Sequence, residues 1–162
     1  MTYRRPNDLL AGRTVDRALR DVYPRLETVT LDPDTPEASY DRLGRRARFA
    51  DLVVVSLYVH AASYQGDVAV PDEVRRFMED LRYQRIPHAV VSFGNPYLLS
   101  EFPDVQAYML AWGGSVASQR AAADALLGRI PIRGSLPTGI PPSFAIGDGI
   151  VLEPKAVRAD GG

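Results

Sequence analysis

Five side chains that suit the binding of a sugar or another polar molecule follow two apolar runs of the chain. In chain order they are His60, Tyr64, Asp67, Asn95 and Tyr97. The first three follow the run DLVVVSLYV, and the last two follow the run AVVSF. Hydroxyl, amide, carboxylate and imidazole groups can hydrogen-bond a polar ligand while aromatic rings stack on it. In open parallel sheets, ligands bind at the carboxyl ends of the strands, so these five residues are the candidate substrate-binding or interface residues.

The same segments offer little for catalysis. Residues 58–70 (YVHAASYQGDVAV) contain one carboxylate and no glutamate, whereas hydrolysis of a glycosidic bond ordinarily uses two carboxyl groups. Ser115, in GGSVA, resembles the nucleophile of a serine hydrolase, but the histidine base follows the serine in that fold, and both His60 and His88 precede it. We therefore predict no catalytic residue and interpret Ser115 as a helix N-cap.

Composition narrows the classes of ligand and partner. The chain has no cysteine, its two histidines lie far apart without clustered carboxylates, and it has no Walker motif, so we predict no metal site and no cofactor. A net charge of -1 over 162 residues gives no electrostatic case for a nucleic acid or a membrane. Residues 1–7 are polar and do not resemble a signal peptide, and the compartment stays undetermined.

Four segments predict strands. Residues 51–59 and 89–93 are nearly continuous apolar runs, residues 26–31 alternate between apolar and polar, and residues 105–112 form the fourth predicted strand. Helical spacing between them predicts four helices: one capped by Thr14, one with Pro36 as its first residue, one with Val74, Phe77, Met78 and Leu81 facing inward, and one with Val116, Ala123, Leu126 and Leu127 facing inward that ends at Gly128. Strands that alternate with helices indicate an α/β fold, here a three-layer α/β/α sandwich with a mostly parallel sheet.

Two features concern the ends of this domain. Thr2-Tyr3 is either the stub of a truncated first strand, or no strand at all in a domain that begins with a helix. In the common doubly wound order the first strand is an interior one, so its loss exposes strand edges and predicts that the isolated chain is marginally stable or self-associates. We place a single domain at 1–145 and a loosely ordered tail at 146–162, where the apolar content falls.

Four pieces of sequence resemble one known family. They are ADLVVVSLYV, the loop ending YQGD, VVSFGNPYLL, and AWGGSVASQRAAADALLGRIPIRGSLPTGIP, and the run from Asp51 to Pro141 that they mark is more than half of the chain. In this order they resemble the C-terminal α/β sandwich domain of glycoside hydrolase family 3, the family of β-glucosidases and β-N-acetylhexosaminidases. The last piece, with its small-residue helix and Gly-x-Leu-Pro ending, is the most specific.

The resemblance implies a separate catalytic (β/α)8 barrel that carries the aspartate nucleophile and precedes the sandwich, in cis or in trans. Many β-glucosidase members place the acid/base glutamate in the loop that corresponds to residues 58–70, where this chain has none. The N-acetylhexosaminidase branch is similar in this respect, because its acid/base lies on the barrel. The chain therefore resembles an accessory domain that is inactive alone. The alternative is a stand-alone α/β module that binds a carbohydrate or another polar molecule without catalysis.

Overall fold

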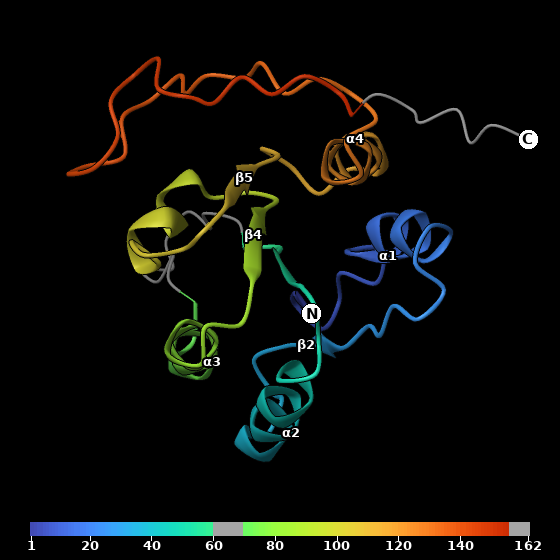
Figure 1. Cartoon of the computed structure of the whole chain (residues 1–162). Helices are drawn as coiled ribbons and strands as arrows, with labels where there is room; N and C mark the ends of the chain where they lie inside the picture. Colours follow the sequence, from blue (N-terminus) through green and yellow to red (C-terminus); the bar gives the residue numbers. More distant parts are fainter. Residues whose placement is uncertain (60–69, 156–162) are drawn as a thin grey trace, which may run out of the picture.

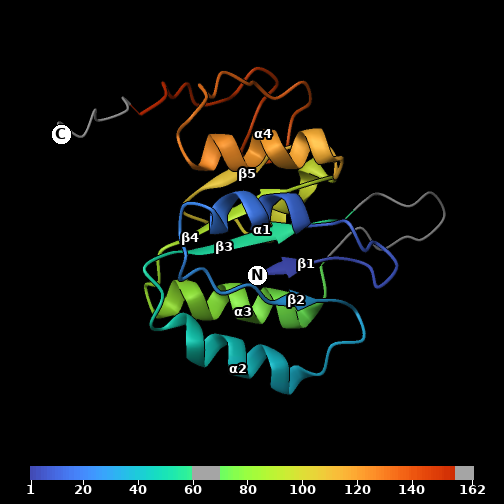
Figure 2. The same cartoon turned by 90° about the vertical axis from the view of Figure 1, so that its right-hand side faces the viewer.

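The computed structural model describes residues 1–59 and 70–155, which form a three-layer α/β/α sandwich (Figures 1 and 2). Its sheet has five parallel strands in the order β2-β1-β3-β4-β5. Their bounds are β1 (Thr2–Tyr3), β2 (Thr30–Leu31), β3 (Val53–Leu57), β4 (His88–Ser92) and β5 (Tyr108–Leu110). The predicted fold class is confirmed.

Two pairs of helices cover the two faces of the sheet. Helices α1 (Arg13–Arg20) and α4 (Val116–Leu126) pack together on one face, while α2 (Glu37–Ala47) and α3 (Asp72–Tyr83) pack together on the other. The short 3-10 helix η1 (Pro96–Glu101) follows β4. None of the described helices combines the length and hydropathy needed to cross a bilayer.

A separate hydrophobic core lies on each face. The larger core contains the inward positions of α3, namely Val74, Phe77, Met78 and Leu81, as the helical spacing predicted. The smaller core lies under α1 and α4 and contains Val15, Leu19, Val91 and Phe93. Strands β3 and β4 supply side chains to both cores, which explains why their sequences are almost continuously apolar.

Several predicted boundaries were wrong by a few residues. Strands β2 and β5 are much shorter than the predicted 26–31 and 105–112, because their residue-to-residue pairing extends over two and three positions. Helix α1 is capped by the backbone of Gly12 rather than by Thr14, and α2 begins at Glu37 with Pro36 as its N-cap. Val116 was predicted to face inward but is 60% exposed.

Strand β1 confirms the interpretation of Thr2-Tyr3 as a short first strand. It pairs with β2 through Thr2↔Thr30 and with β3 through Thr2↔Ser56, so it occupies an interior position of the sheet. The alternative, a domain that begins with a helix, is wrong. With two residues against the five of β3, this strand leaves part of its neighbour's edge uncovered.

Residues 129–155, which we call the arm, fold back on themselves beyond α4 and lie above β5 in Figure 1. Ile132 and Leu152 exchange two backbone hydrogen bonds, and the buried Ile140 anchors the turn region. Bonds also cross the predicted domain boundary at residue 145, since Gly147 N donates to Leu136 O. Where the domain ends along the chain stays a prediction, and residues 156–162 lie outside the described residues.

Candidate functional site at the carboxyl edge of the sheet

The turn after β4 brings two of the five candidate residues to the carboxyl edge. Asn95 is buried, and its backbone N–H donates to Val59 O at 2.9 Å, which ties the turn to the residue just before segment 60–69. The Ser92 hydroxyl donates to Asn95 O at 2.8 Å. The Asn95 side chain accepts a hydrogen bond from Tyr97 N at 3.0 Å, so it caps η1. The hydrogen bonds of Asn95 therefore fix the conformation of the turn that follows β4.

Tyr97 stands at the surface of the same edge. Its ring is 49% exposed, and its hydroxyl lies 3.3 Å from the Thr138 hydroxyl in the arm. This contact joins the turn after β4 to a segment far along the chain. The contact with Thr138 limits how far the ring can turn away from the edge, and the role of Tyr97 in binding stays a prediction.

The other three candidates, His60, Tyr64 and Asp67, lie outside the described residues. Their roles stay predictions. What the structure does describe is the pair of anchors on either side of that segment, at Val59 and at Val70.

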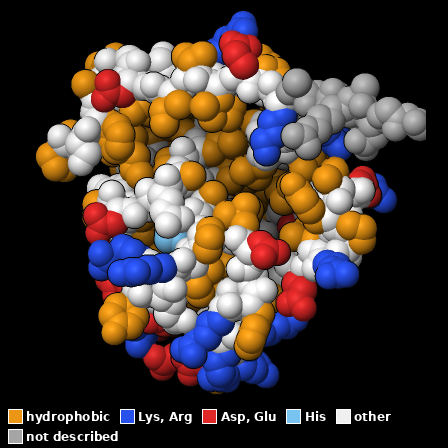
Figure 3. Space-filling model, viewed as in Figure 1, with side chains coloured by type: hydrophobic (Ala, Val, Ile, Leu, Met, Phe, Trp, Pro, Cys, Tyr) orange, Lys and Arg blue, Asp and Glu red, His pale blue; other side chains and the backbone are white. Residues whose placement is uncertain are grey.

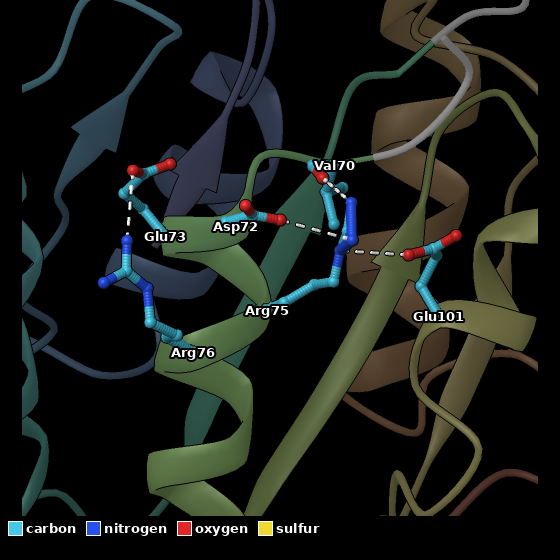
Figure 4. A network of polar contacts seen from close by, with 6 residues as sticks. All are labelled: Val70, Asp72, Glu73, Arg75, Arg76 and Glu101. Carbon is cyan, nitrogen blue, oxygen red and sulfur yellow. Dashed lines mark hydrogen bonds and ion pairs between the residues drawn. The ribbon is translucent and has the colours of Figure 1, made fainter.

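The anchor at Val70 belongs to a charged network at the N-terminus of α3 (Figure 4). Arg75 donates to Val70 O at 3.0 Å and forms ion pairs with Asp72 at 3.3 Å and with Glu101 of η1 at 3.1 Å. The pair with Glu101 is electrostatic, because Arg75 Nε is poorly aligned for a hydrogen bond to it. Arg75 therefore fixes the end of the segment against η1.

Two buried aromatic residues, Tyr58 and Phe93, follow β3 and β4 at this edge. The rings of Tyr58 and Phe93 stack with their centroids 4.4 Å apart and their planes 5° from parallel. Burial raises the pKa of the Tyr58 hydroxyl far above its ordinary value, with a smaller opposing effect from the backbone of Gly12. Tyr58 stays neutral at physiological pH and serves as packing rather than as an acid or a base.

Trp112 and Ser115 lie between β5 and α4. Trp112 adopts a positive φ of 60° and is 48% exposed, although the sequence pattern assigned it to a strand. Ser115 Oγ accepts a hydrogen bond from Ser118 N at 3.1 Å, which confirms that Ser115 is the N-cap of α4. His88 begins β4 at the opposite edge, and its Nδ1 lies 2.8 Å from Ile86 O, so it cannot activate Ser115.

Gln119 is a positioning residue that the sequence pattern did not reveal. It is fully buried in α4, where its side-chain amide donates to Leu10 O at 3.2 Å and to Gly114 O at 2.8 Å. Its carbonyl accepts from Thr14 N at 3.1 Å. One side chain thereby holds the loop after β1, the loop after β5 and the start of α1. Its spacing to Ala122 and Ala123, which also face inward, was the available signal.

No group of three or more histidine and carboxylate side chains that could hold a metal ion occurs within residues 1–59 and 70–155. Several carboxylates at or beside the carboxyl edge already serve local structure. Asp8 accepts from Ala11 N, Asp32 accepts from the Thr35 hydroxyl, and Glu73 pairs with Arg76. The described part of the edge is therefore suited to polar contacts and aromatic stacking more than to acid–base chemistry.

A three-layer parallel sandwich with a polar carboxyl edge defines the structural class, and comparisons with known proteins narrow it. No protein-family model matches the chain. It is 29% identical over 124 residues to a periplasmic beta-glucosidase of Salmonella typhimurium, a match that covers 72% of this chain and 16% of that protein. The resemblance to the C-terminal α/β sandwich domain of glycoside hydrolase family 3 is confirmed by this match.

A solved structure gives the same fold. The chain superposes on part of a structure titled beta-glucoside phosphorylase BglX with a TM-score of 0.50 and 20% identity, covering 79% of this chain and 23% of that one. At this identity the likeness bears on the fold alone. The chain thus spans 16% of the length of the glucosidase and 23% of that of the phosphorylase, so it corresponds to a part of each.

Proposed function

We propose that this chain is the accessory C-terminal domain of a family 3 type glycoside hydrolase, and that it supports a catalytic (β/α)8 barrel. The observation that carries the proposal is how much of each protein the match covers: 72% of this chain but 16% of a beta-glucosidase. A relative in which the matched part is so small must hold most of its machinery elsewhere. The carboxyl edge then lends residues to a cleft that the barrel completes.

The finer specificity follows from segment 58–70. This segment has no glutamate, so the acid/base must come from the barrel, as in the β-N-acetylhexosaminidase branch. Asp67, the segment's one carboxylate, is left to bind substrate hydroxyls together with His60 and Tyr64. We therefore propose a β-N-acetylhexosaminidase-like specificity, although both matched relatives are named for β-glucosides.

The arm supports docking on a larger partner. Figure 3 shows hydrophobic side chains gathered on the face that carries the arm and β5. Large apolar residues of the arm are exposed, namely Phe144, Ile146, Ile150, Val151 and Leu152. Large exposed apolar side chains gathered in one segment are typical of an interface. We propose that the barrel covers it.

Activity assays test the inactivity of the chain alone. Purified protein is incubated with chromogenic β-N-acetylglucosaminide and β-glucoside, and no turnover is expected with either. Turnover that disappears in Asp67→Asn would overturn the proposal, because the chain would then contain its own catalytic carboxylate.

Reconstitution tests the accessory role. A family 3 barrel expressed without its sandwich domain is mixed with this chain, and the expected result is a gain of N-acetylglucosaminidase activity that Ile146→Asp with Ile150→Asp abolishes. Phe49→Asp is the control, because Phe49 is apolar and 91% exposed but lies just after α2. Equal losses in both variants would argue against docking through the arm.

The second candidate function is a stand-alone module that binds a polar molecule such as a sugar. The exposed ring of Tyr97 at the carboxyl edge favours it, since aromatic rings stack on sugars. Titration with N-acetylglucosamine, followed by backbone NMR, would show shifts at Tyr97 and in segment 60–69. Shifts confined to the amino edge, near His88, would contradict both this function and the proposed role of the edge.

A further inference from the structure

A hollow lies in the sheet beside Met1, in line with β1. It has a volume of about 120 Å³, roughly ten times what one water requires. Its wall is mostly apolar and comes from α1, α2, the edge of β3 and the segment before β2, with Val15, Leu19, Leu26, Val29, Leu43, Ala47, Val53 and Val54 among its lining residues. We call this hollow the slot.

The backbone around the slot has the pattern of an unfinished parallel ladder. The Met1 amino group donates to Val54 O at 2.9 Å, and Ser56 N donates to Met1 O at 2.9 Å. Val53 N instead donates to Pro87 O on the other side of β3. Because successive residues of a strand bond in opposite directions, the N–H of Val54 and the carbonyl of Leu52 face the slot.

The other wall continues the same ladder. Thr2 N donates to Val29 O at 2.8 Å, and Arg4 N donates to Leu31 O at 3.1 Å. The alternation therefore turns the N–H of Val29 and the carbonyl of Glu27 toward the slot. Both walls thus present bonding groups with the spacing and direction of one more length of parallel strand.

The side-chain alternation of β1 specifies what the missing length would look like. Met1 and Tyr3 pack against the core under α2 and α3, whereas Thr2 lies on the opposite face against Gly12. A first residue upstream of Met1 would therefore face Val15 and Leu19 of α1, and a second would face Leu43 and Ala47 of α2. Both positions require an apolar side chain.

We propose that the slot is a strand-binding site, and that its occupant is a short apolar segment joined by a peptide bond to Met1, which extends β1 upstream between β2 and β3. An attached segment fits better than a separate strand, because the Met1 nitrogen already bonds to Val54 O in the ladder and Met1 lines the slot. A peptide bond there also replaces a buried charge by a neutral amide. The inference is independent of the proposed function, since it concerns how the sheet is completed.

Two length-matched extensions test the proposal. One adds Val-Ile-Val-Val before Met1, and the control adds Gly-Ser-Gly-Ser. The apolar extension should raise the melting temperature by roughly 5 °C over the control, as expected for burying two or three apolar side chains in a domain of this size. It should also slow hydrogen exchange at the Val54 amide at least tenfold more than at the Val53 amide, which already bonds to Pro87.

Size-exclusion chromatography separates the attached segment from a second copy of the chain. If the chain that begins at Met1 self-associates through the open slot, the apolar extension should make it monomeric, and the Gly-Ser extension should not. Equal melting temperatures and equal exchange at Val54 in the two extended proteins would overturn the proposal. Self-association that persists with the apolar extension would overturn it as well.

Discussion

The sheet has a complete half and an incomplete half. Strands β3 and β4 pair over five positions, from Val53↔His88 to Leu57↔Ser92, and bury side chains on both faces. Strand β1 pairs over two positions with each neighbour and ends beside the slot. The same fold therefore contains a ladder fixed by its own packing and another that depends on a few particular contacts. Local opening should begin in the second.

The largest effect is expected in the complete half. Phe93→Ala removes a fully buried ring that stacks on Tyr58, and should cost about 3–5 kcal/mol of the free energy of unfolding. Urea denaturation followed by circular dichroism measures it. Phe93→Leu, which keeps most of the volume, should cost roughly 1 kcal/mol. Similar losses in the two variants would show that the stack itself matters more than the filled volume.

In the incomplete half, one glycine holds β1 against α1. Gly12 has a φ of +83°, and a Cβ atom there would lie 2.8 Å from the Thr2 side chain. Gly12→Ala should therefore cost about 1–3 kcal/mol, through strain and displacement of β1. Gly44→Ala is the control, because Gly44 lies in α2 with nothing within 4 Å. It should stabilise the protein by about 0.5–1 kcal/mol. A loss in both variants would remove the special role of Gly12.

The amino group of Met1 predicts a pH effect in the incomplete half. Burial lowers its pKa from 8.0, and Asp16 opposes this weakly. The unfolded chain then binds more protons just below pH 8, so stability should rise as the pH approaches 8 and level off above it. Asp16, whose pKa burial raises from 3.8, has its effect at acidic pH.

The measurement is the urea midpoint at pH 6.5 and at pH 8.5. The Gly-Ser extension is the control, because it moves the charged amine away from Val54 and should remove this part of the pH dependence. An identical pH dependence in the two proteins would assign it to other groups.

The smallest effect is expected at the rim of the slot, where Arg46 and Glu27 form an ion pair. Their side chains are 58% and 67% exposed, so solvent screens the pair. Arg46→Ala should cost no more than about 0.5 kcal/mol, measured by the same urea titration. A loss above roughly 1.5 kcal/mol would mean that the stem of Arg46 seals the slot by packing.

The sequence predicted the complete half of the molecule better than the incomplete half. Continuous apolar runs located β3 and β4 to within a few residues, because burial on both faces of the sheet leaves a strong pattern, and the helical spacing of its buried face located α3. The predicted strands 26–31 and 105–112 contain β2 and β5 but were too long, because two or three paired residues leave too short a pattern to define the ends of a strand. Gln119 was missed for a related reason. A buried amide is recognised by the three backbone groups it bonds to, and these come from loops distant in sequence.

The places of two of the five candidate residues were predicted from the sequence, and their role in binding stays a prediction. The position of Asn95 and Tyr97 at the carboxyl edge follows from the strand-to-turn pattern around VVSFGNP, and the structure agrees. The contact between Tyr97 and Thr138 could not be predicted, because no sequence rule returns the arm to that turn. The exposure of the Trp112 side chain could not be predicted either, because Trp112 has a positive φ just after β5 and the sequence pattern had assigned it to the strand.

The way the arm closes has a consequence for engineering this domain. Lys155 N donates to Gly128 O at 2.9 Å, so the arm leaves and rejoins the body at one point beside the end of α4. A segment whose ends lie together can be replaced as a unit, because its two ends can be joined by a short linker and the entropic cost of closing the loop is small. The arm can therefore be shortened or exchanged, or can hold a reporter inserted at its exposed tip, while the sheet keeps its strand order. Sandwich domains with quite different arms would then share one scaffold.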